Sequence, residues 1–236
     1  MKKIIYDIGS NDGKNIEYFL KKSDIVVAVD ANPLLIENIK NKFSNYIKGK
    51  KLFVENYAIY DQDDLYLNFF IHKNHNVLST IIDIKNSPED KDIKNYYTIK
   101  IKSKKISSII SKYGEPYYIK IDIEGADHLA INDLYLNNIY PEYISSEIHD
   151  MRCVDLILKN KKYNYFNLVE GSNVNTIYNN TKILVNNKFE NFNFQSHSSG
   201  PFGEDIQSEW LDKDSMYNLI NNLGFGWRDI HAKKYK

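Results

Sequence analysis

The sequence is poor in cysteine and lacks any long apolar run. Its 236 residues contain one cysteine, Cys153, which excludes an internal disulfide and a zinc site built on cysteines. No stretch approaches the ~20 apolar residues that a membrane-spanning helix needs. The apolar run that starts after Lys3 is too short for the core of a signal peptide. We therefore predict a cytoplasmic protein with no membrane span.

Net charge is also missing, because 31 Lys and Arg residues balance 31 Asp and Glu residues. A protein that neutralises nucleic-acid phosphates usually has a basic surface, so nucleic acid is not the expected partner. The hydrophobic share of 42% is ordinary for a globular protein. The length fits one large α/β domain, or a domain with an extension.

The first half alternates short apolar runs with helical periods, which is typical of βαβ units and a parallel sheet. Asn32 is placed to cap a helix, and Pro33 suits its first position. We expect strands over residues 3–8, 25–30 and 52–57, and helices over residues 14–22 and 33–43.

The second half continues this alternation after a different middle segment. Residues 65–70, 77–82 and 97–102 are expected as inserted strands or hairpins, and Ser103 and Gly114 as the ends of a helix over 106–113. Strands over 117–122, 142–148, 163–169 and 182–185 and helices over 125–137 and 154–161 would complete a doubly wound sheet. The texture changes after about residue 186, where only a helix over 213–223 and a tail over 224–231 are indicated. We predict a cofactor-binding domain over 1–185 and a C-terminal extension or lid over 186–236.

The first strand leads into a turn with the chemistry of a ligand site. Gly9 permits a tight turn and close backbone approach to a ligand, and Gly13 opens the next helix. Asp7 can accept hydrogen bonds from a cationic amino group. Asp30, at the end of the second strand, is placed to bind both hydroxyls of a ribose.

The turn differs from a dinucleotide fingerprint. Nicotinamide cofactors need G-x-G-x-x-G, so that the backbone can approach a pyrophosphate. Here Asn11 occupies the position of the middle glycine, and Asp7 would repel a pyrophosphate. A βα turn with no ligand is the simplest alternative.

Five segments together resemble the FkbM family of methyltransferases. They are "DIGSNDGKN", "VVAVDANP", "NYAIYD", "YIKIDIEGAD" and "EIH", in the family's order over residues 4–149. The departures are Ser10 for Ala, Ile59 for Leu and Asp127 for Glu. The resemblance implies a class I methyltransferase fold, which is Rossmann-like, and S-adenosylmethionine as cofactor. It also implies methylation of hydroxyl groups, often on sugars or polyketides.

The resemblance also assigns the cofactor-binding residues. It implies that Asp30 and Ala31 hold the ribose and that Asn56 and Ala58 lie near the adenine. The methionine part would be held by the first turn, through Asp7, Gly9, Ser10, Asn11 and Gly13.

Polar groups at the ends of the fourth and fifth strands are the catalytic candidates, since open α/β sheets bind ligands at this edge. His149 is our first choice as general base, because its ordinary pKa of ~6.5 lies near working pH. Asp122 would orient His149 or bind the substrate hydroxyl, and Glu147 completes the set. Glu124 is assigned equally to the site or to the start of the next helix.

A divalent metal is a second possibility at these strand ends. Asp122, Glu147 and Asp150 offer the oxygen ligands that Mg²⁺ prefers. The family resemblance does not require a metal, and the sequence leaves the question open.

The polar segment over 196–205 is either a surface loop or a lid facing a sugar, and its length favours a lid. The lid would use five side chains: His197, Phe202, Glu204, Asp205 and Trp210. His231 is a weaker candidate for the same lid.

The sequence therefore predicts an S-adenosylmethionine-dependent O-methyltransferase acting on a hydroxyl of a sugar, a glycan or another small molecule. One alternative is a nicotinamide-linked sugar oxidoreductase or epimerase. Another is a non-catalytic domain that kept the fold. Methyltransferases acting on nucleic-acid bases usually carry N-P-P-Y or D-P-P-Y where this chain has "DIEG". The oligomeric state is left open.

Overall fold

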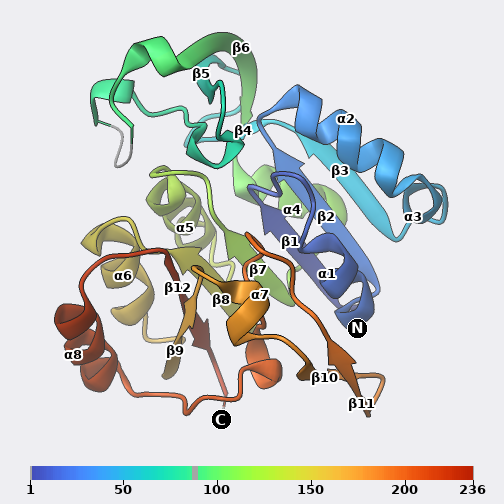
Figure 1. The fold of residues 1–236 in the computed structure, drawn as a ribbon, viewed down its shortest axis with the longest axis vertical. Coiled ribbons are helices and arrows are strands. Elements are labelled where there is room, and N and C mark those ends of the chain that lie inside the picture. Colours follow the sequence, from blue (N-terminus) through green and yellow to red (C-terminus); the bar gives the residue numbers. More distant parts are fainter. Residues whose placement is uncertain (1, 87–89, 236) are drawn as a thin grey trace.

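A mostly parallel sheet forms the centre of the protein (Figure 1). The computed structural model describes residues 2–86 and 90–235. Within them the main sheet has seven strands in the order β3-β2-β1-β7-β8-β12-β9, and only β12 runs antiparallel to its neighbours. The strands are β1 (Ile4–Ile8), β2 (Ile25–Asp30), β3 (Leu52–Asn56), β7 (Tyr118–Ile121), β8 (Tyr143–Glu147), β9 (Tyr165–Glu170) and β12 (Arg228–Lys233).

Helices cover both faces of this sheet, which confirms the doubly wound, Rossmann-like class. One face packs against α4 (Ile106–Tyr113), α5 (Asp127–Leu136), α6 (Met151–Leu158) and α8 (Lys213–Leu223). The other packs against α1 (Ile16–Lys22), α2 (Pro33–Lys42) and α7 (Val174–Ile177), while α3 (Ser44–Lys48) follows α2. Successive side chains of a strand point to opposite faces. Accordingly, Tyr6 and Ile8 join the first core and Ile5 joins the second.

The predicted start of α2 is confirmed. The Asn32 side chain accepts a hydrogen bond from the backbone N–H of Leu34 at 3.1 Å, and Pro33 is the first helical residue. The predicted cap of α4 was wrong. Ser103 lies in β6, where its hydroxyl accepts from the backbone N–H of Leu65 and donates to the carbonyl of Gln62.

The middle of the chain forms a small separate sheet, seen at the top of Figure 1. Its strands are β4 (Ala58–Ile59), β5 (Tyr66–His72) and β6 (Tyr96–Lys104), in the order β4-β6-β5. Three 3₁₀ turns accompany them: η1 (Asn76–Leu78), η2 (Ile84–Asn86) and η3 (Ile93–Asn95). The strand predicted over 77–82 was wrong, because only Thr80 pairs, in a single bridge with Phe70.

Two C-terminal predictions were also wrong. Residues 182–185 do not complete the main sheet, because β10 (Thr181–Val185) pairs with β11 (Lys188–Phe192) in a separate hairpin. The tail supplies the missing strand instead: β12 lies between β8 and β9 (Figure 1). Before it come η4 (Gly203–Asp205) and α8. The C-terminal segment thus contributes to the central sheet.

Among the described residues, none of the helices combines the length and the apolar character needed to cross a membrane.

Candidate functional site

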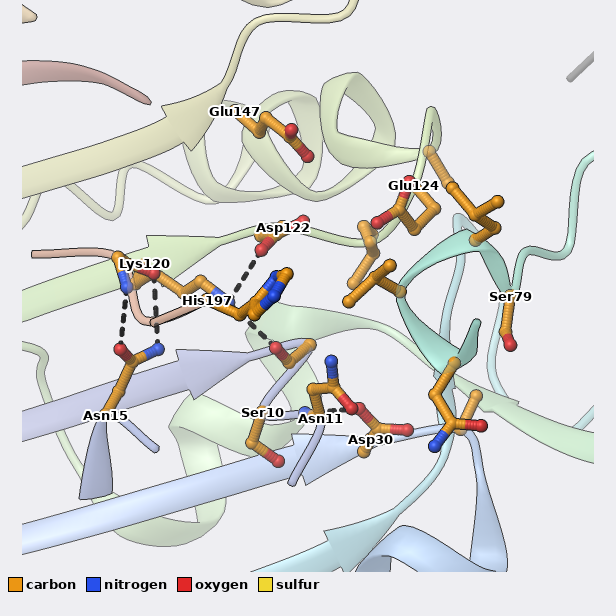
Figure 2. Close-up of a pocket in the computed structure, with 18 of the residues that line it drawn as sticks. Ser10, Asn11, Asn15, Asp30, Ser79, Lys120, Asp122, Glu124, Glu147 and His197 are labelled. Atoms are coloured by element: carbon orange, nitrogen blue, oxygen red, sulfur yellow. Dashed lines mark hydrogen bonds and ion pairs between the residues drawn. The ribbon is translucent and has the colours of Figure 1, made fainter. Parts of the chain in front are cut away.

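A cavity of about 540 Å³ opens at the edge of the main sheet where β1, β2, β7 and β8 end. Figure 2 shows Ser10, Asn11 and Asp30 on one side in this view, and Asp122, Glu124 and Glu147 on the other. Parallel strands place their carboxyl ends at one edge, which explains why residues distant in sequence meet here. Nine of the twelve predicted site residues line this space: Gly9, Ser10, Asn11, Asp30, Ala31, Ala58, Asp122, Glu147 and His149.

The turn after β1 is shaped by a close backbone crossing. Gly9 has a φ of +78°, and a β-carbon there would lie 1.7 Å from the carbonyl oxygen of Asp122. Only glycine fits this position. Within the described structure the buried hydroxyl of Ser10 has no hydrogen-bond partner, so it is available to a ligand.

Asp7 and Gly13 lie behind the turn rather than on the described lining of the cavity. Asp7 is fully buried, and its Oδ1 lies 3.4 Å from Nδ2 of Asn15, which does line the cavity. Burial raises the pKa of Asp7 to about 6. A β-carbon on Gly13 would lie about 3 Å from Ile16 and Ile39, so this glycine serves packing.

Asp30 is held by two backbone amides. Its carboxylate accepts from the N–H groups of Asn11 and Asn32, both at 2.8 Å, and burial raises its pKa to about 6. Asn56 lies outside the described lining and supports the same segment. Its amide donates to the carbonyls of Asp30 and Ala31, at 2.9 and 3.1 Å. Of the two residues expected near an adenine, Ala58 alone lines the cavity.

Lys120 is a central residue that the sequence argument missed. It is 2% exposed, and its ammonium donates to the carbonyl of Gly9 at 2.8 Å and contacts Asp122 Oδ2 at 3.1 Å and Asp7 Oδ1 at 3.7 Å. Burial acts to lower its pKa, but the surrounding carboxylates prevail and raise it. A lysine inside the apolar strand "YIKI" was the signal available in the sequence.

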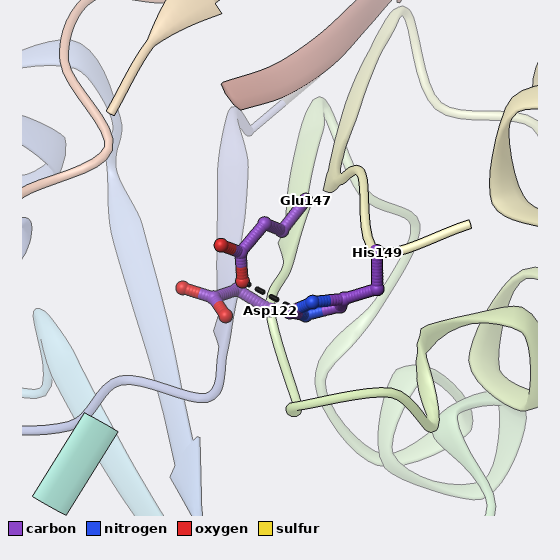
Figure 3. Close-up of side chains that lie close together, drawn as sticks. All are labelled: Asp122, Glu147 and His149. Carbon is purple, nitrogen blue, oxygen red and sulfur yellow. Dashed lines mark ion pairs between the residues drawn. The ribbon is translucent and has the colours of Figure 1, made fainter. Parts of the chain in front are cut away.

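Asp122, Glu147 and His149 point toward one another (Figure 3). His149 Nε2 lies 2.9 Å from Glu147 Oε2 and 4.0 Å from Glu124 Oε2. Within the described structure His149 Nε2 has no hydrogen-bond partner, so we describe its contact with Glu147 as an ion pair.

The charges in this cluster differ from those expected for the separate residues. Burial, with Asp122 nearby, raises the pKa of Glu147 to about 7. Burial acts to lower the pKa of His149, but Glu147 and further carboxylates raise it to about 10. Burial likewise acts to raise the pKa of Asp122, and Lys120 prevails to lower it. His149 is therefore protonated at neutral pH, which removes the pKa argument for it as the base.

Glu124 lines the cavity, whereas Asp150 lies outside its described lining. Glu124 lines the cavity with a φ of +52°, and Asp127 is the acid that closes the turn before α5, through the N–H groups of Ile123 and Gly125. Asp150 caps α6 and pairs with Arg152 at 2.6 Å.

The group of possible metal ligands differs from the expected set by one residue. Asp122, Glu147 and His149 each offer one ligand atom within 4.8 Å of the others, and Asp150 is replaced by His149 in this group. The residue types suit a divalent cation, but the His149–Glu147 and Lys120–Asp122 pairs already balance their charges.

Most of the expected lid residues lie elsewhere. Phe202 is buried and stacks on Tyr118 at 3.9 Å, and Asp205 accepts from the hydroxyl of Tyr18. Glu204 pairs with Lys233, whose ammonium also lies over the ring of Trp210. Of the predicted lid side chains only His197 lines the cavity, together with Ser198 and Ser199. His231 is buried, and burial lowers its pKa to about 3.

Four lining residues of the tail escaped the sequence argument: Phe225, Gly226, Trp227 and Asp229. Asp229 is 5% exposed, and it lies directly opposite Glu147 in the antiparallel register of β12 and β8. Burial, Asp122 and Glu147 raise its pKa. Alternating apolar and polar residues in "RDIHAK" were the signal for this strand.

The fold and the cavity define a Rossmann-like protein with a ligand site at the carboxyl edge of its sheet. The sequence matches the Methyltransferase FkbM domain over residues 7–166, more than half of the chain, and the protein therefore belongs to this family. None of the curated proteins matches the chain.

Two solved structures resemble the protein at low identity. The methyltransferase FkbM from Methylobacillus flagellatus KT is 13% identical with a TM-score of 0.47, over 72% of this chain and 40% of its own. The present chain thus spans two fifths of that protein's length. The plantazolicin methyltransferase BamL, solved with a triazolic desmethylPZN analog and SAH, is 11% identical with a TM-score of 0.37, over 99% of this chain and 78% of its own. Likeness at this level assigns no acceptor.

Proposed function

We propose that the protein is an S-adenosylmethionine-dependent O-methyltransferase that methylates a hydroxyl of a sugar or glycan. One observation carries this proposal. The groups suited to a nucleoside, Asp30 and Asn11, line the same cavity as the acids suited to a hydroxyl, Asp122 and Glu147. Membership in the FkbM family supports the methyl-transfer chemistry.

The residues present fit the cofactor. Asp30 keeps carboxylate lone pairs for ribose hydroxyls. The Ser10 hydroxyl, which has no partner within the described structure, belongs to the turn assigned to the methionine part. S-adenosylmethionine would supply an electrophilic methyl group, to which the acceptor oxygen would bond in line as the carbon–sulfur bond breaks and S-adenosylhomocysteine leaves. Glu147 takes the proton of the acceptor hydroxyl, and the products are a methyl ether and S-adenosylhomocysteine.

Glu147 replaces His149 as our proposed base. A base works best when its pKa lies near the working pH, and Glu147 with a pKa of about 7 meets that condition. The protonated His149 ring holds Glu147 in place at 2.9 Å, and Lys120 keeps Asp122 ionised beside it. His149 is then a positioning residue.

Calorimetric titration with S-adenosylhomocysteine and with NAD tests the cofactor class. We expect micromolar binding of the first and none of the second, since the N–H of Asn11 is committed to Asp30. Asp30→Ala should weaken binding about 10- to 100-fold, because charge-assisted hydrogen bonds contribute about 1.5–3 kcal/mol each. Glu37→Ala, at an exposed position of α2 outside the cavity lining, is the matched control and should leave binding unchanged.

Transfer of a labelled methyl group to a panel of sugars, glycans, catechols and amines tests the acceptor. Methylation of a sugar hydroxyl, located by mass spectrometry, would support the proposal. Exclusive N-methylation, or NAD binding in place of S-adenosylhomocysteine, would refute it. Binding of S-adenosylhomocysteine without transfer to any acceptor would favour a non-catalytic domain.

A further inference from the structure

The cavity has an aromatic rim built by the segment just before β12. Phe225 is 53% exposed and Trp227 is 40% exposed, and both line the cavity together with His197. Large aromatic side chains that remain this exposed beside a cavity commonly mark a binding site. We refer to Phe225, Trp227 and His197 as the aromatic rim.

Trp227 is held in a defined position. Its carbonyl accepts from the N–H of Gly171 at 2.8 Å, and a β-carbon on Gly171 would lie 2.4 Å from the indole ring. The ring centroid of His197 lies 5.1 Å from that of Trp227. The indole therefore loses little conformational freedom when a ligand packs on it.

Trp227 lies in the acceptor half of the cavity. The strand order places β1, β7 and β8 between β2, which carries Asp30, and β12. At about 4.8 Å per strand, β12 lies about 19 Å from β2. Trp227 is two residues from Asp229, which is paired with Glu147 across the sheet. An acceptor hydroxyl near Glu147 thus brings the rest of its ring toward Trp227.

Among the described residues, both lysines that line the cavity are already paired with acids. Six acids line it within the described structure: Asp12, Asp30, Asp122, Glu124, Glu147 and Asp229. Both lining lysines and His149 already pair with one of them: Lys14 with Asp12 at 3.1 Å, Lys120 with Asp122 at 3.1 Å and His149 with Glu147 at 2.9 Å. A phosphate or carboxylate on the acceptor would find no unpaired lysine or arginine among these described lining residues, and it would lie beside the carboxylates of Asp122 and Glu147.

Asp229 adds a positive reason for a hydroxylated ligand. Its Oδ2 is buried and has no hydrogen-bond partner in the described structure. A buried carboxyl oxygen without a partner is costly, and a ligand hydroxyl can satisfy it because a hydroxyl both donates and accepts. An aromatic face beside such a carboxyl group suits a ring with an apolar face and a polar edge.

We propose that the acceptor is a glycosyl ring bearing neither phosphate nor carboxylate, stacked on Trp227 with its hydroxyls directed to Glu147 and Asp229. This inference rests on the proposed sugar methyltransferase function and narrows its substrate class. It makes Trp227 a specificity-determining residue.

The two tryptophans permit a direct binding test. In the ¹⁵N-labelled protein loaded with S-adenosylhomocysteine, Trp210→Phe assigns the two indole N–H signals. The probes are the methyl glycosides of glucose, galactose and N-acetylglucosamine, with glucosamine, against glucose 6-phosphate and glucuronate. At least one uncharged or amino sugar should shift the Trp227 signal in a saturable way. The acidic sugars should bind more weakly than that sugar by a factor of about ten or more. Equal or tighter binding of the acidic sugars, or no shift by any of the others, would overturn the proposal.

Methyl transfer to the sugar that binds provides the second test. Trp227→Ala should raise the acceptor KM about tenfold or more, while Trp227→Phe should keep most of the affinity. Phe189→Ala, a 74% exposed aromatic on β11, is the control and should change neither KM nor kcat. An unchanged KM in Trp227→Ala would refute the role of Trp227. Absence of methyl transfer to sugars that do shift the Trp227 signal would instead count against the proposed function.

Discussion

At the scale of single residues, the site is governed by how a few charges share one buried space. Glu147 and His149 sit two positions apart at the end of β8, and neither keeps its ordinary pKa. The pKa of Glu147 is raised because burial disfavours its charged form. The pKa of His149 is raised because carboxylates surround the imidazole. Their order of proton affinity makes Glu147 the group that can exchange a proton near neutral pH.

The first prediction concerns pH. Because the pKa of Glu147 is raised to about 7, its base-competent carboxylate is lost as pH falls through 7. We expect kcat/KM to be about tenfold lower at pH 6 than at pH 8. Glu147→Gln should lower kcat by about 10²- to 10⁴-fold. A rate profile that stays flat between pH 6 and 8, measured where S-adenosylhomocysteine affinity is constant, would contradict this role.

The second prediction concerns His149. Removing its positive charge in His149→Ala takes away the partner that lowers the pKa of Glu147. The acidic limb of the rate profile should therefore move to higher pH, while activity at high pH is partly retained. His128→Ala, at a half-buried imidazole on α5, is a comparison variant and should leave the limb in place. If the limb does not move in His149→Ala, the ion pair does not set the pKa of the base.

At the scale of elements, the turn between β1 and α1 depends on one glycine. Gly9 needs a positive φ and also crosses the backbone of Asp122, whereas Gly224 has a φ of +70° with no atom within 4 Å of an added β-carbon. Substitution of Gly224 therefore tests backbone strain alone, whereas substitution of Gly9 adds a steric overlap with the backbone of Asp122.

The third prediction uses this pair. Gly224→Ala should cost about 1–2 kcal/mol of unfolding free energy through strain alone. Gly9→Ala should cost more than about 4 kcal/mol, because β1 and β7 must separate locally to admit the methyl group. Urea denaturation followed by circular dichroism measures both. Similar losses in the two variants would show that the crossing adjusts easily.

At the scale of the whole molecule, the last strand of the chain, β12, is an interior strand of the main sheet. β12 enters between β8 and β9 and brings Asp229 opposite Glu147. The C-terminal segment is therefore joined to the sheet by ladders on both sides, as well as to the cavity by His197 and Trp227.

The fourth prediction follows from this arrangement. A chain cut after residue 186 loses β12 and exposes the facing edges of β8 and β9, so it should not fold or bind S-adenosylhomocysteine. A chain ending at Lys233 keeps β12 and is the matched control. Circular dichroism and calorimetric titration distinguish the two. Full cofactor affinity in the shorter chain would show that the sheet tolerates the loss of this strand.

The sequence alone determined the parts that depend on local pattern. The alternation of apolar runs and helical periods predicted the parallel half of the sheet, and Asn32 and Pro33 predicted the start of α2. The segment from Asp7 to Gly13 and the acids after β2, β7 and β8 indicated where the cavity lies, since parallel strands end at a common edge.

Tertiary structure decided what depends on contacts between distant segments. Pairing partners are not encoded locally, so the sequence did not reveal that 182–185 forms a hairpin while 228–233 enters the main sheet. Proton affinities depend on burial and on neighbouring charges, so the shift of His149 to an imidazolium and of Glu147 toward neutrality appeared only once both were placed. The environment of Lys120 among three acids and the position of Trp227 at the cavity mouth were fixed in the same way, by the packing of strands far apart in the chain.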